Sequence, residues 1–566
     1  MQIIKELPPN LDNGADGIYV ALDIELFGLN PKQLHRPTSG KFACLSICYE
    51  PDTVYLITNS FDINEILARF RNAIWVMHNA KFDLTHLRRW AYIPPRKKLW
   101  DTMLIEKILW GGYYDLFALE HLARRYLDIS IDKSLQKSFE DAEELSDKQI
   151  EYAAQDANIT LQVLQKQRKY VTKKDYGIWR EVDLPALWSI MDFQGFAVDK
   201  NRWITLAEIN KAKADALEKA LPFNSKSPKQ VKEALSASGF KRLSNTQEKT
   251  LNKFISKYPD EEATKLAKKV LECRKLAKRA STYGMKFIEN YLEQDLLHGV
   301  DVIHCDYHIT GAETGRMASS RPNMQNIPTK DTKDFRYCFI ARPGNKIIVV
   351  DWGQQELRIL AYQSQDKELI NLLSKTDKDI FVLMVKLTYR KNVKKTDPMR
   401  DEMKSFAYGI AYGLSIPEFA ERAGITLDKA EEVQNLFFSR FSGLYQYLTE
   451  QEKNKNKVET VLGRKIHLNR YSHQCENNAK NGPIQGTAAD MLKKALAQLH
   501  QDWQFPYPFA VVGAIHDEIV LDVPKDHAQE IADFVKERMI NVAEEMCPGV
   551  NFIASAVIGD NWGCKE

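Results

Sequence analysis

Acidic side chains and one tyrosine occur in three short motifs within the first third of the chain. Asp23 and Glu25 end the apolar run ALDIE, and because side chains alternate along a strand, both carboxylates point to one side of a sheet. A D-x-E pair alone is most often a solvated strand end, so two further motifs matter. HNAKFD and YAAQD supply Asn79, Asp83, Tyr152 and Asp156.

Together these side chains predict a metal-dependent nuclease site. Converging carboxylates repel each other unless cations lie between them, and oxygen-only ligands suit Mg²⁺ or Mn²⁺. Two ions about 3.5–4 Å apart could hold the attacking and leaving oxygens of a phosphodiester. The hydroxyl of Tyr152 could orient the attacking water. The predicted metal ligands are Asp23, Glu25, Asp83 and Asp156.

A second group of reactive side chains lies in the C-terminal half. In RDEMKSFAYGIAYG, two cations and two aromatic rings recur every four residues, which stacks them on one helix face. They are Arg400, Lys404, Tyr408 and Tyr412. Such a face could be a snorkelling surface, but it also suits a nucleotide, which has a phosphate end and a flat ring end. The cations would hold the triphosphate, and Tyr408 would contact the sugar and base.

Two acidic motifs flank this stripe. Asp351 ends the apolar run NKIIVVDW, and Glu356 follows five residues later. Asp517 and Glu518 lie at the bend of a hairpin predicted over residues 509–523. Each motif alone has an ordinary explanation, a helix cap for Asp351 and a polar turn for the hairpin. Their joint occurrence with the stripe favours a functional site.

Several domains must position these side chains, because 566 residues are too many for one core. Residues 17–170 alternate apolar strands with helical stretches and predict an α/β unit. Residues 201–300 predict an elongated helical subdomain, and residues 366–450 a mostly helical region.

Composition narrows the class of protein. No segment approaches the ~18 apolar residues of a membrane span, and the N-terminus lacks a signal-peptide core, so we expect a soluble, intracellular protein. The eight cysteines show no zinc-binding pattern, and no phosphate-binding loop of ATPases occurs. The net charge of +3 does not indicate nucleic acid, although a basic segment with Lys275 and Lys278 could bind phosphates or simply be solvated.

The first set of motifs resembles the DEDDy family of 3′→5′ exonucleases, whose five signature positions occur here in order. The second set resembles motifs A, B and C of family A DNA polymerases, the DNA polymerase I family. This resemblance covers nearly the whole chain and includes TGRMASSRPNMQNIP, PIQGTAAD and GDNWG. It implies a template-directed DNA polymerase with a fused proofreading exonuclease.

The resemblance also implies an α/β and α+β multidomain fold. A ribonuclease H-like exonuclease domain (residues 1–170) would precede a right-hand polymerase domain (residues 171–566). The expected parts of the hand are a thumb near 201–300, fingers near 366–470, and a palm from about 171–200, 301–365 and 471–566. Since the exonuclease motifs begin near residue 17, we expect no 5′-nuclease activity from this chain.

The resemblance assigns roles at the polymerase site. Asp351 and Asp517 would hold two Mg²⁺ ions, with Mn²⁺ as a substitute, and Glu518 would be catalytic beside them. The ions lower the pKa of the primer 3′-hydroxyl and neutralise the triphosphate. Lys404 could donate a proton to the leaving pyrophosphate. Glu356 would be the steric gate that excludes a ribose 2′-hydroxyl.

Other matching positions are implied to contact substrate. Gln355 and Tyr412 would face the nucleotide, with Tyr412 stacked near the templating pair. Arg316 and Gln485 would test pair geometry in the minor groove, where acceptors recur at every correct pair. The remaining expected DNA contacts come from His516 near the primer terminus, Asn79, Lys275 and Lys278.

Two positions distinguish this chain within the family. Tyr408 stands where many members carry Phe, and the motif wording is similar to replicative polymerases of bacteriophages. Tyr there implies tolerance of dideoxynucleotides. Phe381 stands where members usually have His, so one contact with the triphosphate is expected to be missing.

We weighed three alternatives: a single-subunit RNA polymerase, a nuclease of the RNase D type with a binding module, and a nucleic-acid-binding scaffold with inactive sites. The gate residue, the fused exonuclease and the intact carboxylates favour the DNA polymerase. Its expected partners are primer–template DNA and dNTPs. We expect a monomer in a bacterial cytoplasm, that of a free-living or of an infected cell. The sequence does not identify any helicase, primase or single-strand-binding protein.

Overall fold

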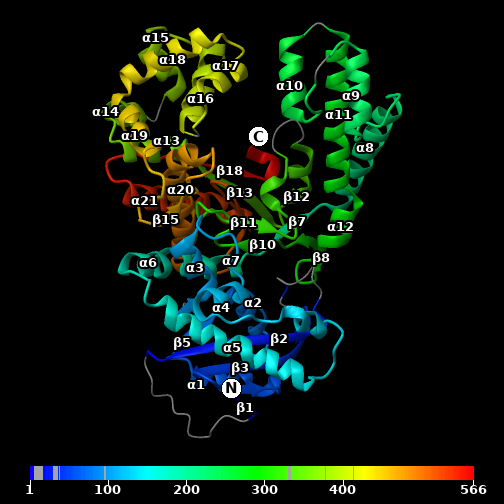
Figure 1. Ribbon diagram of the computed structural model, residues 1–566, viewed down its shortest axis with the longest axis vertical. Coiled ribbons are helices and arrows are strands. Elements are labelled where there is room, and N and C mark those ends of the chain that lie inside the picture. The colour runs from blue at the N-terminus through cyan, green and yellow to red at the C-terminus, as the bar shows by residue number, and fades with distance from the viewer. Residues whose placement is uncertain are drawn as a thin grey trace.

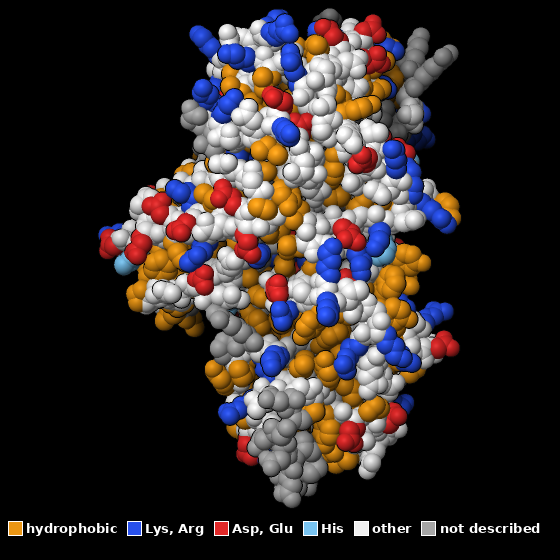
Figure 2. Space-filling view, turned by 90° about the vertical axis from the view of Figure 1, so that its left-hand side faces the viewer, with side chains coloured by type: hydrophobic (Ala, Val, Ile, Leu, Met, Phe, Trp, Pro, Cys, Tyr) orange, Lys and Arg blue, Asp and Glu red, His pale blue; other side chains and the backbone are white. Residues whose placement is uncertain are grey.

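The computed structural model describes residues 1–5, 17–29, 36, 39–94, 97–240, 243–259, 261–328, 333–375, 378–411 and 413–565. Figure 1 shows an α/β domain at one end, a central sheet, and two helical subdomains side by side at the other end. No helix among the described residues combines the length and apolar character of a membrane span. On the face in Figure 2, acidic and basic side chains are interspersed.

The N-terminal domain is built on a mixed sheet with the order β1-β4-β3-β2-β5-β6. Strands β2 and β3 pair in antiparallel fashion, whereas β5 and β6 continue the sheet in parallel. The strands are β1 (Gln2–Ile4), β2 (Tyr19–Phe27), β3 (Lys41–Glu50), β4 (Thr53–Ile57), β5 (Ile74–Met77) and β6 (Leu99–Asp101).

Helices cover this sheet, and α5 packs on both β2 and β3. A capping box begins α5, because Ser146 accepts from the backbone of Gln149 and the Gln149 side chain returns to Ser146. The helices are α1 (Ile63–Arg69), α2 (Ala80–Leu87), α3 (Thr102–Trp110), α4 (Leu119–Leu127) and α5 (Asp147–Gln167), with short turns η2 (Ser60–Asp62) and η3 (Lys133–Phe139).

A helical connector of α6 (Lys173–Ile178), η4 (Trp179–Asp183) and α7 (Leu184–Met191) joins this domain to the central antiparallel sheet. The order of that sheet is β16-β17-β13-β18. Its strands and the helices near it are β13 (Asn345–Trp352), β16 (Val511–Ile515), β17 (Glu518–Pro524), β18 (Ala554–Gly559), α20 (Cys475–Gln501) and α21 (Ala528–Met546).

The nearly continuous apolar sequence of β13 is explained by burial of both faces of the strand. Ile348 and Val350 belong to a large core that runs from the N-terminal sheet through the connector to the helices around the central sheet. The alternate residues Ile347 and Val349 enter a second core on the opposite face. Because both faces of β13 are covered from Ile347 to Val350, an apolar residue is favoured at each of these positions before Asp351.

The two helical subdomains rise beyond the central sheet (Figure 1). One has its own small core and consists of α8 (Lys200–Lys219), α9 (Pro228–Ala237), α10 (Glu248–Lys257), α11 (Glu262–Thr282) and α12 (Met285–Tyr291). The other consists of α13 (Gln355–Ser364), α14 (Lys367–Leu373), α15 (Ile380–Tyr389), α16 (Pro398–Ala411), α17 (Ile416–Ala423), α18 (Leu427–Arg440) and α19 (Ser442–Glu452).

Short strands complete the polymerase half. A small sheet has the order β12-β7-β9-β8, and two hairpin-like pairs stand apart from it. These elements are β7 (Phe196–Val198), β8 (Leu292–Asp295), β9 (Val300–Ile303), β10 (Asp306–His308), β11 (Ala318–Ser320), β12 (Phe339–Ile340), β14 (Lys457–Glu459) and β15 (Lys465–His467), with turns η5 (Met324–Asn326), η6 (Lys333–Cys338), η7 (Lys525–His527) and η8 (Trp562–Lys565).

Candidate active sites

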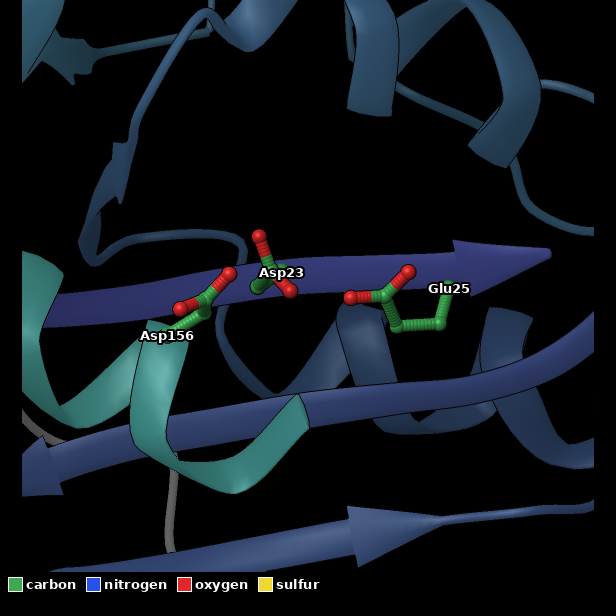
Figure 3. A group of neighbouring side chains, drawn as sticks. All are labelled: Asp23, Glu25 and Asp156. Atoms are coloured by element: carbon green, nitrogen blue, oxygen red, sulfur yellow. The ribbon is translucent and has the colours of Figure 1, made fainter. Parts of the chain in front are cut away.

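Three of the predicted carboxylates meet above the N-terminal sheet. Asp23 and Glu25 project from the same side of β2, and Asp156 approaches from α5, as Figure 3 shows. One oxygen of each lies within 4.8 Å of the others. Oδ2 of Asp23 and Oδ1 of Asp156 are buried without a hydrogen-bond partner among the described residues. Buried oxygens of this kind fit a divalent cation.

The fourth carboxylate, Asp83, is buried on α2, and its Oδ1 accepts from the backbone N–H of Ile24 at 3.1 Å. Helix α2 starts at Asn79, which adopts a left-handed conformation (φ 64°). Asp101 accepts from the backbone N–H groups of Asn79 (3.2 Å) and Ala80 (2.8 Å) and also caps α3. Sequence analysis missed Asp101, although an Asp between a strand and a helix is a typical N-cap signal.

Burial and mutual repulsion shift the acidity of this cluster. Burial, with a further contribution from Asp156, raises the pKa of Asp23 to about 8. Burial and then the charge of Asp23 raise the pKa values of Glu25 and Asp83 well above their ordinary range. Burial also raises the pKa of Asp156, although Lys133 opposes it. A bound cation would relieve this repulsion, which again fits a metal site.

A lysine that sequence analysis did not identify completes the cluster. Lys133 on η3 donates to the hydroxyl oxygen of Tyr152 at 2.9 Å and to Oδ2 of Asp156 at 2.8 Å. Its ammonium therefore connects the residue expected to orient water with an expected metal ligand. No sequence signal marks Lys133, because it lies in a short turn well before α5.

The second predicted site lies on the central sheet. In the sheet register, Asp351 stands opposite both Glu518 and Ser555. A cavity of about 650 Å³ adjoins this edge. Its wall includes the expected residues Asp351, Asp517, Glu356, Gln355, Tyr408, Arg316 and His516. The fold thus brings together side chains that are up to about 200 positions apart in the sequence.

The acidic residues in this wall and the neighbouring Glu518 differ in their partners. Burial and then the charge of Asp351 raise the pKa of Asp517 to about 6. The Glu518 carboxylate is buried and accepts from Arg336 (3.2 Å) and Trp562 (3.0 Å). Glu518 is therefore held by buried protein donors, whereas Asp351 and Asp517 line the cavity, where their oxygens suit ligation of a divalent cation.

Two expected substrate contacts are engaged with protein. Arg316 donates to Glu356 at 2.6 Å, so the expected minor-groove probe and the expected gate form an ion pair. Gln355 lies in the cavity wall, but its side-chain amide points to Sδ of Met491 at 3.4 Å. Contact of the Gln355 side chain with a nucleotide would require this amide to turn.

The cation and aromatic stripe lies on α16, as its four-residue spacing predicted. Arg400 pairs with Asp379 at 2.9 Å, Lys404 is exposed, and Tyr408 is half-buried. Tyr412 lies outside the described residues. Phe381 packs against the stripe: its ring centre is 5.3 Å from the Arg400 guanidinium and 5.7 Å from the Tyr408 ring. The aromatic residue that departs from the family pattern thus supports the stripe from α15.

The other expected DNA contacts are distributed over two helices. Lys275 and Lys278 are exposed on α11, and Gln485 is half-buried on α20. The glycine after Gln485 is required by packing, because a Cβ at Gly486 would lie 3.0 Å from the carbonyl oxygen of Thr314. Helix α20 can therefore approach the TGR loop closely at Gly486.

Family models cover both halves of the chain. Residues 200–564 match DNA polymerase family A, and residues 4–171 match a 3′-5′ exonuclease. The chain belongs to DNA polymerase family A. It is a DNA-directed DNA polymerase with an N-terminal 3′→5′ exonuclease domain, as predicted, which disfavours the RNA polymerase and nuclease-only alternatives.

Relatives of this family A polymerase are bacterial. DNA polymerase I of Aquifex aeolicus is 30% identical over 86% of this chain and 87% of that protein. DNA polymerase I of Pseudomonas aeruginosa is 27% identical over 86% of this chain but only 56% of its own length. A solved structure, the POL domain of Pol1 from M. smegmatis in complex with DNA primer-template and dNTP, shares the fold, with a TM-score of 0.83, 22% identity and 100% coverage of both chains.

Ion pairs join the two halves of the polymerase. Lys81 on α2 pairs with Asp306 on β10 and donates to the carbonyl oxygen of Tyr307 at 2.6 Å. Lys107 on α3 donates to the carbonyl oxygen of Thr310 at 2.8 Å. A cavity of about 240 Å³ lies between the halves, and its wall includes Asn79. The exonuclease helices are thus anchored to the segment that leads to Arg316.

Within the polymerase half, a fully buried network links the connector element η4 to α20. Arg464 binds Asp183 of η4 at 2.7 Å and Asp490 of α20 at 2.7 Å, and Lys493 binds Asp183 at 2.9 Å. Burial alone would raise the pKa of Asp183, but Arg464 and Lys493 lower it below its ordinary value. Removing one partner would leave an uncompensated buried charge, which is strongly destabilising.

Proposed function

We propose that this polymerase extends a primer 3′ end with dNTPs by two-metal phosphoryl transfer and proofreads with its exonuclease domain. The observation that carries the proposal is the common cavity of Asp351, Asp517, Glu356 and Tyr408. When bound by Asp351 and Asp517, two divalent ions, Mg²⁺ or alternatively Mn²⁺, would activate the primer 3′-hydroxyl and neutralise the triphosphate.

The chain's own residues position the nucleotide. Arg400 and Lys404 bind its phosphates, and Lys404 supplies a proton to the leaving pyrophosphate. Arg400 has a carboxylate partner in Asp379, so it exchanges this partner for phosphate oxygens. The Glu356 carboxylate occupies the space beside the sugar and excludes a 2′-hydroxyl. Tyr408 closes the ring side of the cavity, and its hydroxyl can replace the contact that a dideoxynucleotide lacks.

DNA is bound by residues of the polymerase cavity and by two helices near it. Arg316 and Gln485 donate to minor-groove acceptors of the terminal pair, and His516 lies near the primer terminus. Lys275 and Lys278 on α11 contact phosphates of the duplex. Primer–template DNA and dNTPs are therefore the partners of the polymerase site.

At the exonuclease site, Asp23, Glu25, Asp83 and Asp156 hold the divalent cations, again two Mg²⁺ or Mn²⁺ ions. Tyr152 orients the attacking water toward the terminal phosphodiester. Asn79, which begins α2, binds the single-stranded primer end. Asn79 also lines the cavity between α2 and β10, whose wall includes Lys81 and Lys107.

The motif wording RDEMKSFAYGIAYG and DWGQQELR, with Tyr408, supports replication in a phage-like setting, and the protein acts as a monomer. Phe381 takes the place of a phosphate-binding side chain and instead braces Arg400.

Separation of the two activities tests the proposal. Asp351→Asn should abolish primer extension and leave degradation of single-stranded DNA near the wild-type rate. Asp23→Ala should do the reverse, because the two clusters lie in different domains. Extension and degradation are measured on a 5′-labelled primer in Mg²⁺. Equal loss of both activities in either variant would contradict two independent sites.

A further inference from the structure

The ammonium of Lys565 lies between two carboxylates of the polymerase site. Its Nζ is 3.0 Å from Oδ2 of Asp351 and 3.0 Å from Oε2 of Glu518. Lys565 belongs to η8, at the C-terminal end of the described chain, whose Trp562 is fully buried and donates to Glu518. The buried tryptophan therefore fixes where the lysine returns to the active site.

We propose that Lys565 is a positioning residue that takes the place of a cation beside Asp351 in the metal-free polymerase and thereby weakens divalent-metal binding at this site. This inference rests on the proposed function, in which Asp351 and Asp517 are metal ligands. Lys565 lies two residues after the family motif GDNWG and is not part of it.

The partners of the two carboxylates show which one depends on Lys565. Glu518 already receives hydrogen bonds from Arg336 and Trp562 on its other oxygen. Asp351 has Ser555 on Oδ1 at 2.8 Å, and Lys565 is the cation on its Oδ2. A metal ion that binds Oδ2 of Asp351 must either displace the Lys565 ammonium or share this oxygen with it.

The local charge balance points the same way. Among the described residues, Lys565 forms ion pairs with Asp351 and Glu518, Arg336 pairs with Glu518, and the negative charges of both carboxylates act on Asp517. The guanidinium of Arg336 is buried against Glu518, whereas the Lys565 side chain is 27% exposed. Lys565 can therefore withdraw along its flexible stem, and removing its charge leaves the site more negative and more attractive to a divalent cation.

The test is a Mn²⁺ titration of the full chain, with free Mn²⁺ followed by electron paramagnetic resonance. All proteins carry Asp23→Ala and Asp156→Ala, which remove the exonuclease cluster. We expect Lys565→Met to bind Mn²⁺ at the polymerase site ~3- to 10-fold more tightly, the scale of a partly exposed charge pair. Lys565→Arg should bind as the parent does. Unchanged or weaker binding in Lys565→Met overturns the proposal.

A surface lysine on the same sheet provides a matched control. Lys346 pairs with Asp560 at 2.6 Å at the far end of β13, and Lys346→Met removes the same charge without touching the site. Equal tightening in Lys346→Met and Lys565→Met would show a bulk charge effect and contradict the inference. Lys565→Gln, which keeps hydrogen-bond donors but no charge, should reproduce the tightening.

Two further measurements show whether a negative result concerns the proposed metal site or only the role of Lys565. If Asp351→Asn in the same background leaves Mn²⁺ binding unchanged, the proposed metal site itself is wrong. If Asp351→Asn loses the ion while Lys565→Met binds as the parent does, only the role of Lys565 is wrong. Thermal unfolding in EDTA and in Mn²⁺ gives a readout independent of activity: Lys565→Met should gain more in Tm from Mn²⁺ than the parent does.

Discussion

Lys133 contacts two different groups of the exonuclease site, the hydroxyl of Tyr152 and the carboxylate of Asp156. Its ammonium bonds both the hydroxyl oxygen of Tyr152 and the carboxylate of Asp156, so it orients the first and offsets the charge of the second. It is a positioning residue rather than a group that reacts. The element that carries it, η3, packs against both β2 and α5 through Phe139, which contacts Phe27 and Tyr152.

Lys133→Met should lower the exonuclease rate ~10- to 100-fold, the scale of a lost charge-assisted hydrogen bond, and leave primer extension unchanged. The measurement is degradation of a labelled single strand, with kcat and KM separated. The fall should appear in kcat, and Lys133→Arg should restore part of it. Lys137 is exposed in the same turn, so Lys137→Met is the control; if it lowers the rate as much, η3 rather than Lys133 is responsible.

Glu356 is the second residue with a specific consequence. Arg316 holds its carboxylate at 2.6 Å, and the side chain is 11% exposed, so it fills a defined part of the nucleotide cavity. Glu356→Ala should raise ribonucleotide incorporation relative to deoxyribonucleotide incorporation by ~10-fold or more, equivalent to about 1.4 kcal/mol. Single-turnover insertion of matched rNTP and dNTP pairs measures this ratio. An unchanged ratio would remove the gate role.

At the scale of elements, apolar runs predicted the strands and a four-residue spacing of side chains predicted a helix. The apolar runs before Glu25 and Asp351 are strands β2 and β13, although β2 does not end at Glu25 as expected but continues to Phe27. Residues 509–523 contain the hairpin of β16 and β17, with His516 and Asp517 in its turn, whereas Glu518, expected at the bend, is the first residue of β17. The Arg400 to Tyr408 spacing is helical in α16. These predictions are confirmed because they depend on local burial, which the sequence records directly.

Contacts between elements could not be read from the sequence. Lys133 and Lys565 act through partners that are distant along the chain, and a single lysine carries no periodic signal. The role of Phe381 could not be predicted either, because its packing against Arg400 depends on how α15 and α16 cross. Tertiary packing rather than local propensity decides these three positions, whereas Asp101 has a local N-cap signal that could have identified it.

The anchoring of α2 to the palm predicts a coupling between domains. Lys81→Met should lower excision of a mispaired primer end from duplex DNA ~2- to 30-fold, because α2 loses its fixed relation to β10. Asp306→Asn breaks the same pair from the polymerase side and should have a similar effect. Burial opposes ionisation, but Lys81 and His308 lower the pKa of Asp306 to about 2. The pair therefore persists above pH 4 and is lost only as pH falls toward 2.

Excision assays between pH 6 and 8 should accordingly show a constant difference between wild type and both variants. A normal rate of mispair excision in Asp306→Asn would mean that Lys81 acts on DNA directly and not through the domain contact.

At the scale of the whole molecule, one continuous core and the ion pair of Lys81 with Asp306 join the exonuclease domain to the polymerase. The buried pair of Arg464 with Asp183 fixes the connector between them. The predicted order of domains along the chain agrees with the element order, although the exact boundaries stay predictions. Sequence motifs identified the carboxylates of both sites. The structure adds that each cluster has a lysine beside it, Lys133 in one and Lys565 in the other.

The central claim is that this single chain both extends and proofreads a primer. The most direct measurement uses the wild-type protein in Mg²⁺ with a 5′-labelled primer that ends in a mispair on a longer template. Without dNTPs, the primer should shorten; with all four dNTPs, it should lose the mispaired nucleotide and then reach full length. Shortening under both conditions, or extension that retains the mispair, would contradict this account.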